Sequence, residues 1–171
     1  MDKKLAYHFS KIYKSYSTQI YRFVYIKVSS QETAEDLTSE VFVRFWKTFQ
    51  KSGQDKIRNP RAFLYKVAKN MVIDFYRSQN QPKPLSTDEV PEMADITQEL
   101  EKKELALSDQ EQIQKSIQKL KDEDQDVILW YYLDQMPISE IAEITEKSEG
   151  AVRVMIHRAM EALRQVLEIK N

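Results

Sequence analysis

The sequence predicts an all-α protein of two small helical domains, residues 1–80 and 108–171, joined by an acidic linker of residues 81–107. Three observations support this fold class. The 171 residues include only 2 glycines, and no alternating strand-like segment is bounded by turn signals. Apolar residues recur at helical spacing in several segments. Residues 79–96 carry three prolines and no periodicity, as a linker does.

The composition excludes several classes of site. Without cysteine there is no disulfide or thiolate metal site, and the 2 histidines, His8 and His157, lie far apart. Two glycines cannot form the common nucleotide-binding loops. We therefore expect no metal and no cofactor. The charged N-terminus and the short apolar runs predict a cytoplasmic protein without a signal peptide or membrane insertion.

Charge is unevenly distributed along the chain. Residues 1–80 hold 15 Lys and Arg against 7 Asp and Glu, a net charge of +8. Residues 81–124 hold 6 against 12, a net of −6, and residues 125–171 hold 5 against 8, a net of −3. A basic N-terminal half followed by an acidic segment predicts a polyanionic partner for the first domain.

Two helical segments begin the chain. Residues 5–28 are expected to form one or two helices whose aromatic side chains belong to the core. Residues 31–50 are strongly amphipathic, and Phe42 and Trp46 extend their apolar surface beyond one stripe. Such a helix is deeply buried or packs against a partner, and burial is the simpler interpretation. The expected core face consists of Ala34, Leu37, Val41 and Phe45, and the other side of Asp36, Glu40, Arg44 and Lys47.

A loop over residues 51–59 precedes a helix that Pro60 opens. Basic side chains alternate here with Tyr65 and Tyr76, a combination suited to unpaired nucleic-acid bases. An ordinary surface helix with solvated lysines fits the same pattern. The expected core side consists of Phe63, Val67, Met71 and Phe75, and the basic side of Lys66, Lys69, Asn70 and Arg77.

The C-terminal domain is expected to start with short helices. Residues 97–107 are a candidate helix, and Ser108 with Glu111 forms a possible capping box for the next one. Acidic residues then open a helix over residues 122–133. The predicted core residues are Ile113, Ile117, Leu120, Val127, Ile128, Trp130 and Tyr131.

Residues 137–167 have the layout of a helix-turn-helix. Pro137 starts the first helix, and Ser148 can cap the second. The second helix places apolar residues on one face and polar residues opposite. A helical hairpin with a solvated charged face fits this periodicity equally well. The apolar face consists of Val152, Ile156, Ala159 and Leu163, and the opposite face of Val154, His157, Arg158 and Glu161, flanked by Arg153 and Arg164.

Three segments resemble one known family, the extracytoplasmic-function (ECF) type of the sigma-70 transcription initiation factors. AEDLTSEVFVRFWKTF resembles the helix that binds the clamp of RNA polymerase, and NPRAFLYKVAKNMVIDFYR resembles the promoter-melting segment. LKDEDQDVILWYYLDQMPISEIAEITEKSEGAVRVMIHRAMEALR resembles the C-terminal domain that binds the −35 element. Together these segments span most of the chain in the family's order.

The resemblance implies roles for individual residues. Core RNA polymerase would bind Asp36, Glu40, Phe42 and Arg44. A loop that captures a flipped −10 base would contain Lys56, Arg58 and Asn59. The helix beside the melted strand would present Arg61, Lys69, Asn70 and Arg77. The helix that reads the −35 duplex would use Arg153, Val154, His157 and Arg158. The resemblance also implies promoter DNA and an anti-sigma factor as partners, and it implies no catalytic residue and no enzymatic activity.

The chain departs from the family pattern at several positions. Val154 and Met155 follow Arg153 where a small polar and a basic residue are usual, and Phe63 replaces a common tryptophan. The segment before the helix-turn-helix is acidic where the family is often basic, which predicts weak DNA binding by this domain alone. Two alternatives remain: a regulator that binds duplex DNA without polymerase, and a nucleic-acid-processing enzyme, for which no carboxylate pair is evident.

Overall fold

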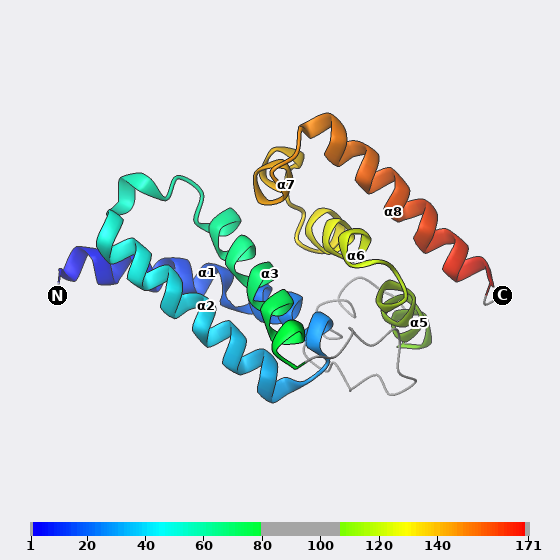
Figure 1. Cartoon of the computed structure of the whole chain (residues 1–171), viewed down its shortest axis with the longest axis horizontal. Helices are drawn as coiled ribbons and strands as arrows, with labels where there is room; N and C mark the ends of the chain where they lie inside the picture. Colours follow the sequence, from blue (N-terminus) through cyan, green and yellow to red (C-terminus); the bar gives the residue numbers. More distant parts are fainter. Residues whose placement is uncertain (1, 80–106, 170–171) are drawn as a thin grey trace. The chain divides into compact units, whose positions relative to one another are not determined.

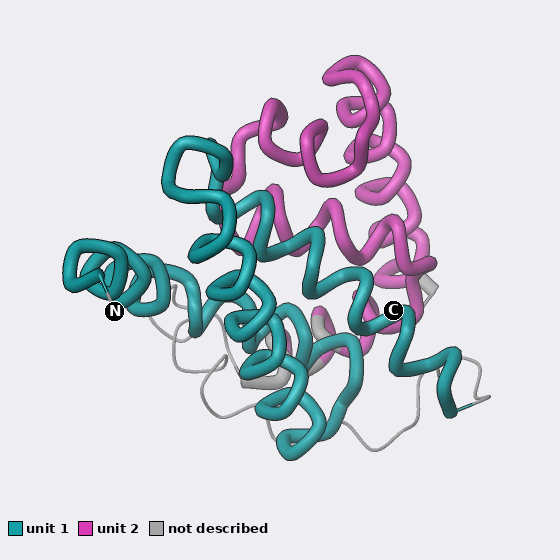
Figure 2. The backbone as a smooth tube through the Cα atoms, turned by 60° about the vertical axis from the view of Figure 1, so that its left-hand side comes forward, with its two compact units in different colours: residues 1–82 teal, residues 83–171 magenta. Residues whose placement is uncertain are grey.

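The computed structural model describes residues 2–79 and 107–169, and all regular structure in these ranges is helical. The chain divides into two compact units, residues 1–82 and residues 83–171 (Figures 1 and 2). The predicted all-α fold class is therefore confirmed. None of the described helices is long and apolar enough to cross a membrane.

Unit 1 contains three long helices that pack on one another (Figure 1). Each begins at a side-chain cap. In the first helix Asp2 accepts a hydrogen bond from the Lys4 amide at 2.9 Å, and in the second Ser30 accepts one from the Thr33 amide at 3.3 Å. Asn59 caps the third. Residues 5–28 lie in one helix rather than two. The elements are α1 (Lys3–Val28), α2 (Gln31–Ser52), the 3₁₀ turn η1 (Gln54–Lys56) and α3 (Pro60–Ser78).

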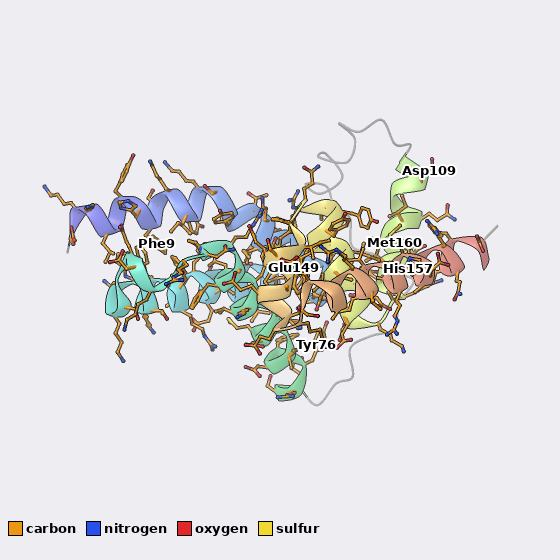
Figure 3. The ribbon with its side chains drawn as sticks, turned by 90° about the horizontal axis from the view of Figure 1, so that it is seen from above. Phe9, Tyr76, Asp109, Glu149, His157 and Met160 are labelled. Atoms are coloured by element: carbon orange, nitrogen blue, oxygen red, sulfur yellow. The ribbon has the colours of Figure 1, made fainter. Side chains whose placement is uncertain are left out.

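Aromatic rings fill the contact between α1 and α2. Figure 3 shows Phe9 on the side of α1 that faces α2, where its ring centroid lies 6.1 Å from that of Phe45 and 4.9 Å from that of Trp46. Phe45 also contacts Phe49 and Phe63. The predicted core face of α2 is largely confirmed, because three of its residues are buried and Leu37 is half-buried. The buried three are Ala34, Val41 and Phe45.

The buried side of α3 differs from the predicted one. Of the predicted residues only Met71 is buried, whereas Phe63, Val67 and Phe75 are half-buried. The buried face is rotated by about one residue, since α1 and α2 both pack against α3 and together select which apolar residues lie inside. The buried residues of α3 are Ala62, Leu64, Tyr65, Ala68, Met71 and Val72.

Unit 2 differs from the prediction in one helix. The helix expected over residues 122–133 changes to a π-helical turn after Ile128, in which the Asp134 amide donates to the Leu129 carbonyl at 3.0 Å. The helix expected over residues 97–107 lies outside the described residues except for Leu107, which begins α5, and the side chains of Ser108 and Glu111 are also not described. The elements are α5 (Leu107–Gln118), α6 (Asp122–Ile128), η2 (Leu129–Leu133), α7 (Ile138–Thr145) and α8 (Glu149–Ile169).

The core of unit 2 supports α8. Val127, Ile128 and Trp130 are buried as predicted, and Tyr131 is half-buried. Gln125 is also buried, and its side-chain amide donates to the carbonyl oxygens of Gln118 and Leu120, both at 3.1 Å. These carbonyls lie at and just beyond the end of α5, where the helix offers no partner. Gln125 therefore has a structural role, although it follows the acidic residues at the start of α6.

Candidate nucleic-acid and polymerase interfaces

A tight turn joins α7 to α8 and sets the start of the second helix. Glu146 adopts the left-handed conformation, with φ of 56°, and its amide donates to the Ala142 carbonyl at the end of α7. Ser148 accepts a hydrogen bond from the Ala151 amide at 3.1 Å. The predicted cap is therefore confirmed, and the two helices and their short turn have the layout of a helix-turn-helix.

Helix α8 separates a buried face from an exposed face as the sequence predicts. Its buried residues are Val152, Ile156, Ala159 and Leu163. The four predicted DNA-reading residues are all exposed, and Val154 keeps 48% of its surface accessible. Figure 3 labels one of them, His157, on α8. These four exposed residues are Arg153, Val154, His157 and Arg158. Side chains with this exposure on a second helix can reach base edges in a major groove.

Acidic groups accompany the arginines of α8. The Arg153 Nη2 lies 3.6 Å from a carboxylate oxygen of Glu149, and the Arg164 Nη1 lies 2.7 Å from one of Glu161. Burial raises the pKa of Asp124 on α6 above its usual value. The nearby cations of Lys121 and Arg158 oppose this rise, and the negative charge of Glu123 adds to it. The sequence analysis did not single out Glu149, although its spacing of four residues from Arg153 is the spacing of ion pairs on one helix.

The segment between α2 and α3 carries the predicted base-capturing residues. Lys56 and Arg58 are exposed, whereas Asn59 is half-buried. The side-chain oxygen of Asn59 accepts a hydrogen bond from the Ala62 amide at 3.1 Å and thereby caps α3. The amide hydrogens of Asn59 take no part in this cap and can donate to a base edge.

Helix α3 places its polar residues on a surface, but its tyrosines belong to the fold. Tyr65 is fully buried, with its ring centroid 5.4 Å from that of Phe23. The hydroxyl of Tyr76 (Figure 3) donates to the Lys27 carbonyl at 2.6 Å. The prediction that Tyr65 offers a surface for stacking bases is therefore wrong, and Ile73 is an exposed apolar residue that the sequence did not single out. Of the predicted polar residues, Asn70 and Arg77 are exposed, and Arg61, Lys66 and Lys69 are half-buried.

The outer side of α2 carries the predicted charged residues. Asp36 and Arg44 are exposed, and Arg44 lies 3.2 Å from a carboxylate oxygen of Glu40. Phe42, expected on the same surface, is only 3% exposed, and its ring packs edge-on against Tyr13 at 4.8 Å. Its place on the polymerase-facing surface is therefore incorrect in this structure, and Val43 is the exposed apolar residue there.

No group of three or more His, Cys, Asp or Glu side chains that could hold a metal occurs in the described parts of the chain. The exposed features found there are instead charged helix faces and a basic loop, which suit contact with macromolecules.

Comparison with known proteins identifies the family. The family model of Sigma-70 region 2 matches residues 12–81, and that of Sigma-70, region 4 matches residues 110–163. The ECF RNA polymerase sigma factor SigW of Bacillus subtilis (strain 168) is 30% identical over 176 residues, covering 93% of this chain and 88% of SigW. BldN of Streptomyces coelicolor is 28% identical over 162 residues, and the match spans 93% of this chain and 60% of BldN.

Two solved structures share the fold. CnrH, in complex with the cytosolic domain of CnrY, has a TM-score of 0.68 at 19% identity over 95% of this chain and 89% of its own. The sigma factor RpoE, in complex with the anti-sigma factor NepR from Bartonella quintana, has a TM-score of 0.69 at 15% identity over 96% of this chain and 99% of its own. Because both sigma-70 regions match in order, and because SigW is similar across most of both chains, this chain belongs to the ECF type of the sigma-70 family of promoter-specific transcription initiation factors.

Proposed function

We propose that this protein binds core RNA polymerase through the outer side of α2, binds the melted −10 strand with the loop before α3 and α3 itself, and reads the −35 duplex with α8. Residues 1–80 and 108–171 are then its −10 and −35 domains. The protein contributes no catalytic chemistry of its own and works in the cytoplasm with the polymerase.

The exposed face of α8 carries this proposal. Arg153 and Arg158 can each donate to guanine or to phosphate, and His157 adds a further polar group. Val154 offers an apolar contact that suits the methyl group of thymine. Since the opposite face of α8 is buried in unit 2, only this side of the helix is available to a groove.

The outer side of α2 supports the polymerase contact. Asp36, Glu40 and Arg44 form a mixed-charge surface around the exposed Val43, while Phe42 holds the helix against α1. An apolar centre with a charged surround is common in protein–protein interfaces. We therefore assign the contact to Asp36, Glu40, Val43 and Arg44 and give Phe42 a supporting role.

The −10 assignment is supported by charge more than by aromatic surface. Lys56, Arg58 and Arg77 are exposed cations that can neutralise the phosphates of a single strand. Asn59 retains amide hydrogens that can donate to a flipped base while its oxygen caps α3. The anti-sigma partner is proposed by similarity, because CnrH and RpoE have this fold and each was solved in complex with another protein, RpoE with an anti-sigma factor.

Run-off transcription on genomic fragments tests the proposal. Core polymerase alone and the protein alone should give no defined transcript, whereas the two together should start transcription at discrete sites. Co-purification with core polymerase checks the contact directly. If the protein alone binds specific duplexes with nanomolar affinity and leaves the polymerase's start sites unchanged, it is instead a regulator that acts without polymerase.

A further inference from the structure

Glu149 is an acidic residue at the start of the helix that we expect to enter a DNA groove. It is the first residue of α8 (Figure 3), and its carboxylate lies 3.6 Å from the Arg153 guanidinium one turn further on. The two side chains are 53% and 60% exposed. Ion pairs with this exposure contribute little to stability, whereas the positive end of the helix dipole favours a carboxylate in the first turn of a helix. Folding therefore accommodates an acid here, and its effect on DNA binding is a separate consequence.

An acidic group at this place opposes DNA binding in general. A duplex carries one negative charge per ~1.7 Å of its axis, so the Glu149 carboxylate is repelled from every sequence alike. The domain has little positive charge to offset that repulsion, because residues 125–171 hold 5 Lys and Arg against 8 Asp and Glu. Besides the Arg153 guanidinium, a hydrogen-bond donor on the duplex itself can relieve this repulsion.

Such a donor exists in the major groove. The amino groups of cytosine and adenine both point into it, but that of adenine lies beside the N7 acceptor and suits Asn or Gln, whereas Asp and Glu accept from that of cytosine. Residues one helical turn apart are separated by about 6 Å along the axis, which corresponds to one or two base-pair steps. Glu149 and Arg153 can therefore meet neighbouring but different base pairs.

We propose that Glu149 determines −35 specificity by accepting a hydrogen bond from a cytosine amino group close to the base pair that Arg153 reads. Duplexes without this donor repel the carboxylate and offer it no partner on the DNA. The inference rests on the proposed function of α8. It adds a residue whose contribution is to penalise incorrect sequences as well as to favour the correct one.

The test uses the holoenzyme formed with core polymerase and promoter fragments in which each −35 position is varied. The variant Glu149→Gln keeps the size of the side chain but removes its charge and its purely accepting character. We expect the cytosine preference at one position to fall about tenfold, with tighter binding to fragments that lack a −35 element. The matched control is Glu161→Gln, which alters the other Glu–Arg pair of α8 and should leave every preference unchanged.

The outcomes separate the possible roles. An unchanged preference, or an equal change for all fragments, overturns the proposal, because Glu149 then acts only on phosphates or not at all. If Glu149→Gln and Arg153→Ala alter the base preference at the same −35 position and nowhere else, that result overturns the base contact of Glu149, since Glu149 would then act through Arg153. Glu149→Asp, which keeps the carboxylate, should retain part of the preference, and thermal melting checks that each variant folds.

The same experiment contains a check on the proposed function itself. If the wild-type holoenzyme shows no −35 preference at all, the role of α8 in reading the duplex is wrong, independently of Glu149. If the wild-type protein shows a preference that Glu149→Gln leaves intact, only the role of Glu149 is wrong.

Discussion

The hydroxyl of Tyr76, near the end of α3, donates a hydrogen bond of 2.6 Å to the main-chain carbonyl oxygen of Lys27 in the last turn of α1. The last carbonyls of a helix have no partner within it, so this bond satisfies one of them. It also connects two helices that lie 49 residues apart in the sequence at this point. A tyrosine that the sequence suggests as a partner for bases therefore has a structural role.

Removing that hydroxyl should lower stability without affecting promoter melting. Tyr76→Phe keeps the ring and leaves the Lys27 carbonyl without this donor, which should cost unit 1 about 1 kcal/mol. Thermal or urea unfolding measures the loss, and run-off transcription below the melting temperature should match the wild-type protein. Unchanged stability together with slower promoter opening would instead show that Tyr76 contacts the melted strand.

Asn59 combines a structural and a proposed functional role that two variants can separate. Asn59→Ala removes the cap of α3 and should destabilise unit 1 by about 1 kcal/mol. Asn59→Asp keeps an oxygen that caps the helix but has no amide hydrogen for a base. We expect the Asp variant to melt near the wild-type temperature and to lose transcription. Wild-type transcription from the Asp variant would remove Asn59 from base capture.

Charge reversal on α2 tests the polymerase contact. Glu40→Arg should weaken core binding about tenfold or more, because it presents the opposite charge to the polymerase surface. Helix content should stay the same, since Glu40 is substantially exposed and its pair with Arg44 lies on the surface. Binding can be measured by titrating core polymerase against labelled protein.

Two further variants separate a loss of polymerase binding from a loss of folding at α2. Glu35→Arg, on the flank of the same helix and hydrogen-bonded to Gln31, is the matched control and should bind normally. Phe42→Ala should destabilise the unit by about 3–5 kcal/mol, because its ring is buried against Tyr13. If Glu40→Arg destabilises the protein as much as Phe42→Ala does, the surface assignment is wrong.

Asp124 predicts a pH dependence of the stability of unit 2. Burial raises its pKa in the folded protein above the ordinary value of 3.8, so the folded state binds this proton more tightly than the unfolded state. Stability from this group is therefore full below pH 3.8 and is lost as the pH rises through the higher folded pKa. At neutral pH the charged carboxylate is destabilising.

Asp124→Asn should consequently stabilise the protein at pH 7 and give little advantage near pH 3.5. The free energy of unfolding, measured by urea titration at both pH values, checks this. Glu143→Gln, which changes an exposed acid on α7, is the control. Destabilisation by Asp124→Asn that is larger at pH 7 would show that attraction to Lys121 and Arg158 outweighs burial.

Periodicity predicted some faces well because one apolar stripe allows only one orientation. On α8, Val152, Ile156, Ala159 and Leu163 form one stripe with charged residues on the opposite side, and all four are buried as predicted. On α3 apolar and aromatic residues occur on several sides, so the pattern does not fix which side is inside. The contacts of α3 with α1 and α2 decide it, and they bury Tyr65 in place of Phe63.

Tertiary contacts also explain what the sequence could not predict at the candidate sites. Phe42 is buried because Tyr13, 29 residues earlier, packs on its ring. The π turn after Ile128 is accompanied by a hydrogen bond of 2.8 Å from the Met136 amide to the Trp130 carbonyl, beyond the end of the helix. Neither contact has a local signature. The helix-turn-helix was predicted because its cap, turn and stripe are all local.

The central claim is that the exposed face near the start of α8 reads the −35 duplex, and Arg153 and Arg164 allow a matched comparison. Their side chains are 60% and 62% exposed, and each pairs with a glutamate of α8. Arg164 lies about 16 Å further along the helix, away from the end expected in the groove. The measurement is holoenzyme binding to promoter fragments with every −35 position varied. Arg153→Ala should cost about 1–3 kcal/mol and relax the preference at one −35 position, whereas Arg164→Ala should change no preference. Equal losses for the two variants, or a loss that is the same for all −35 sequences, would contradict the claim.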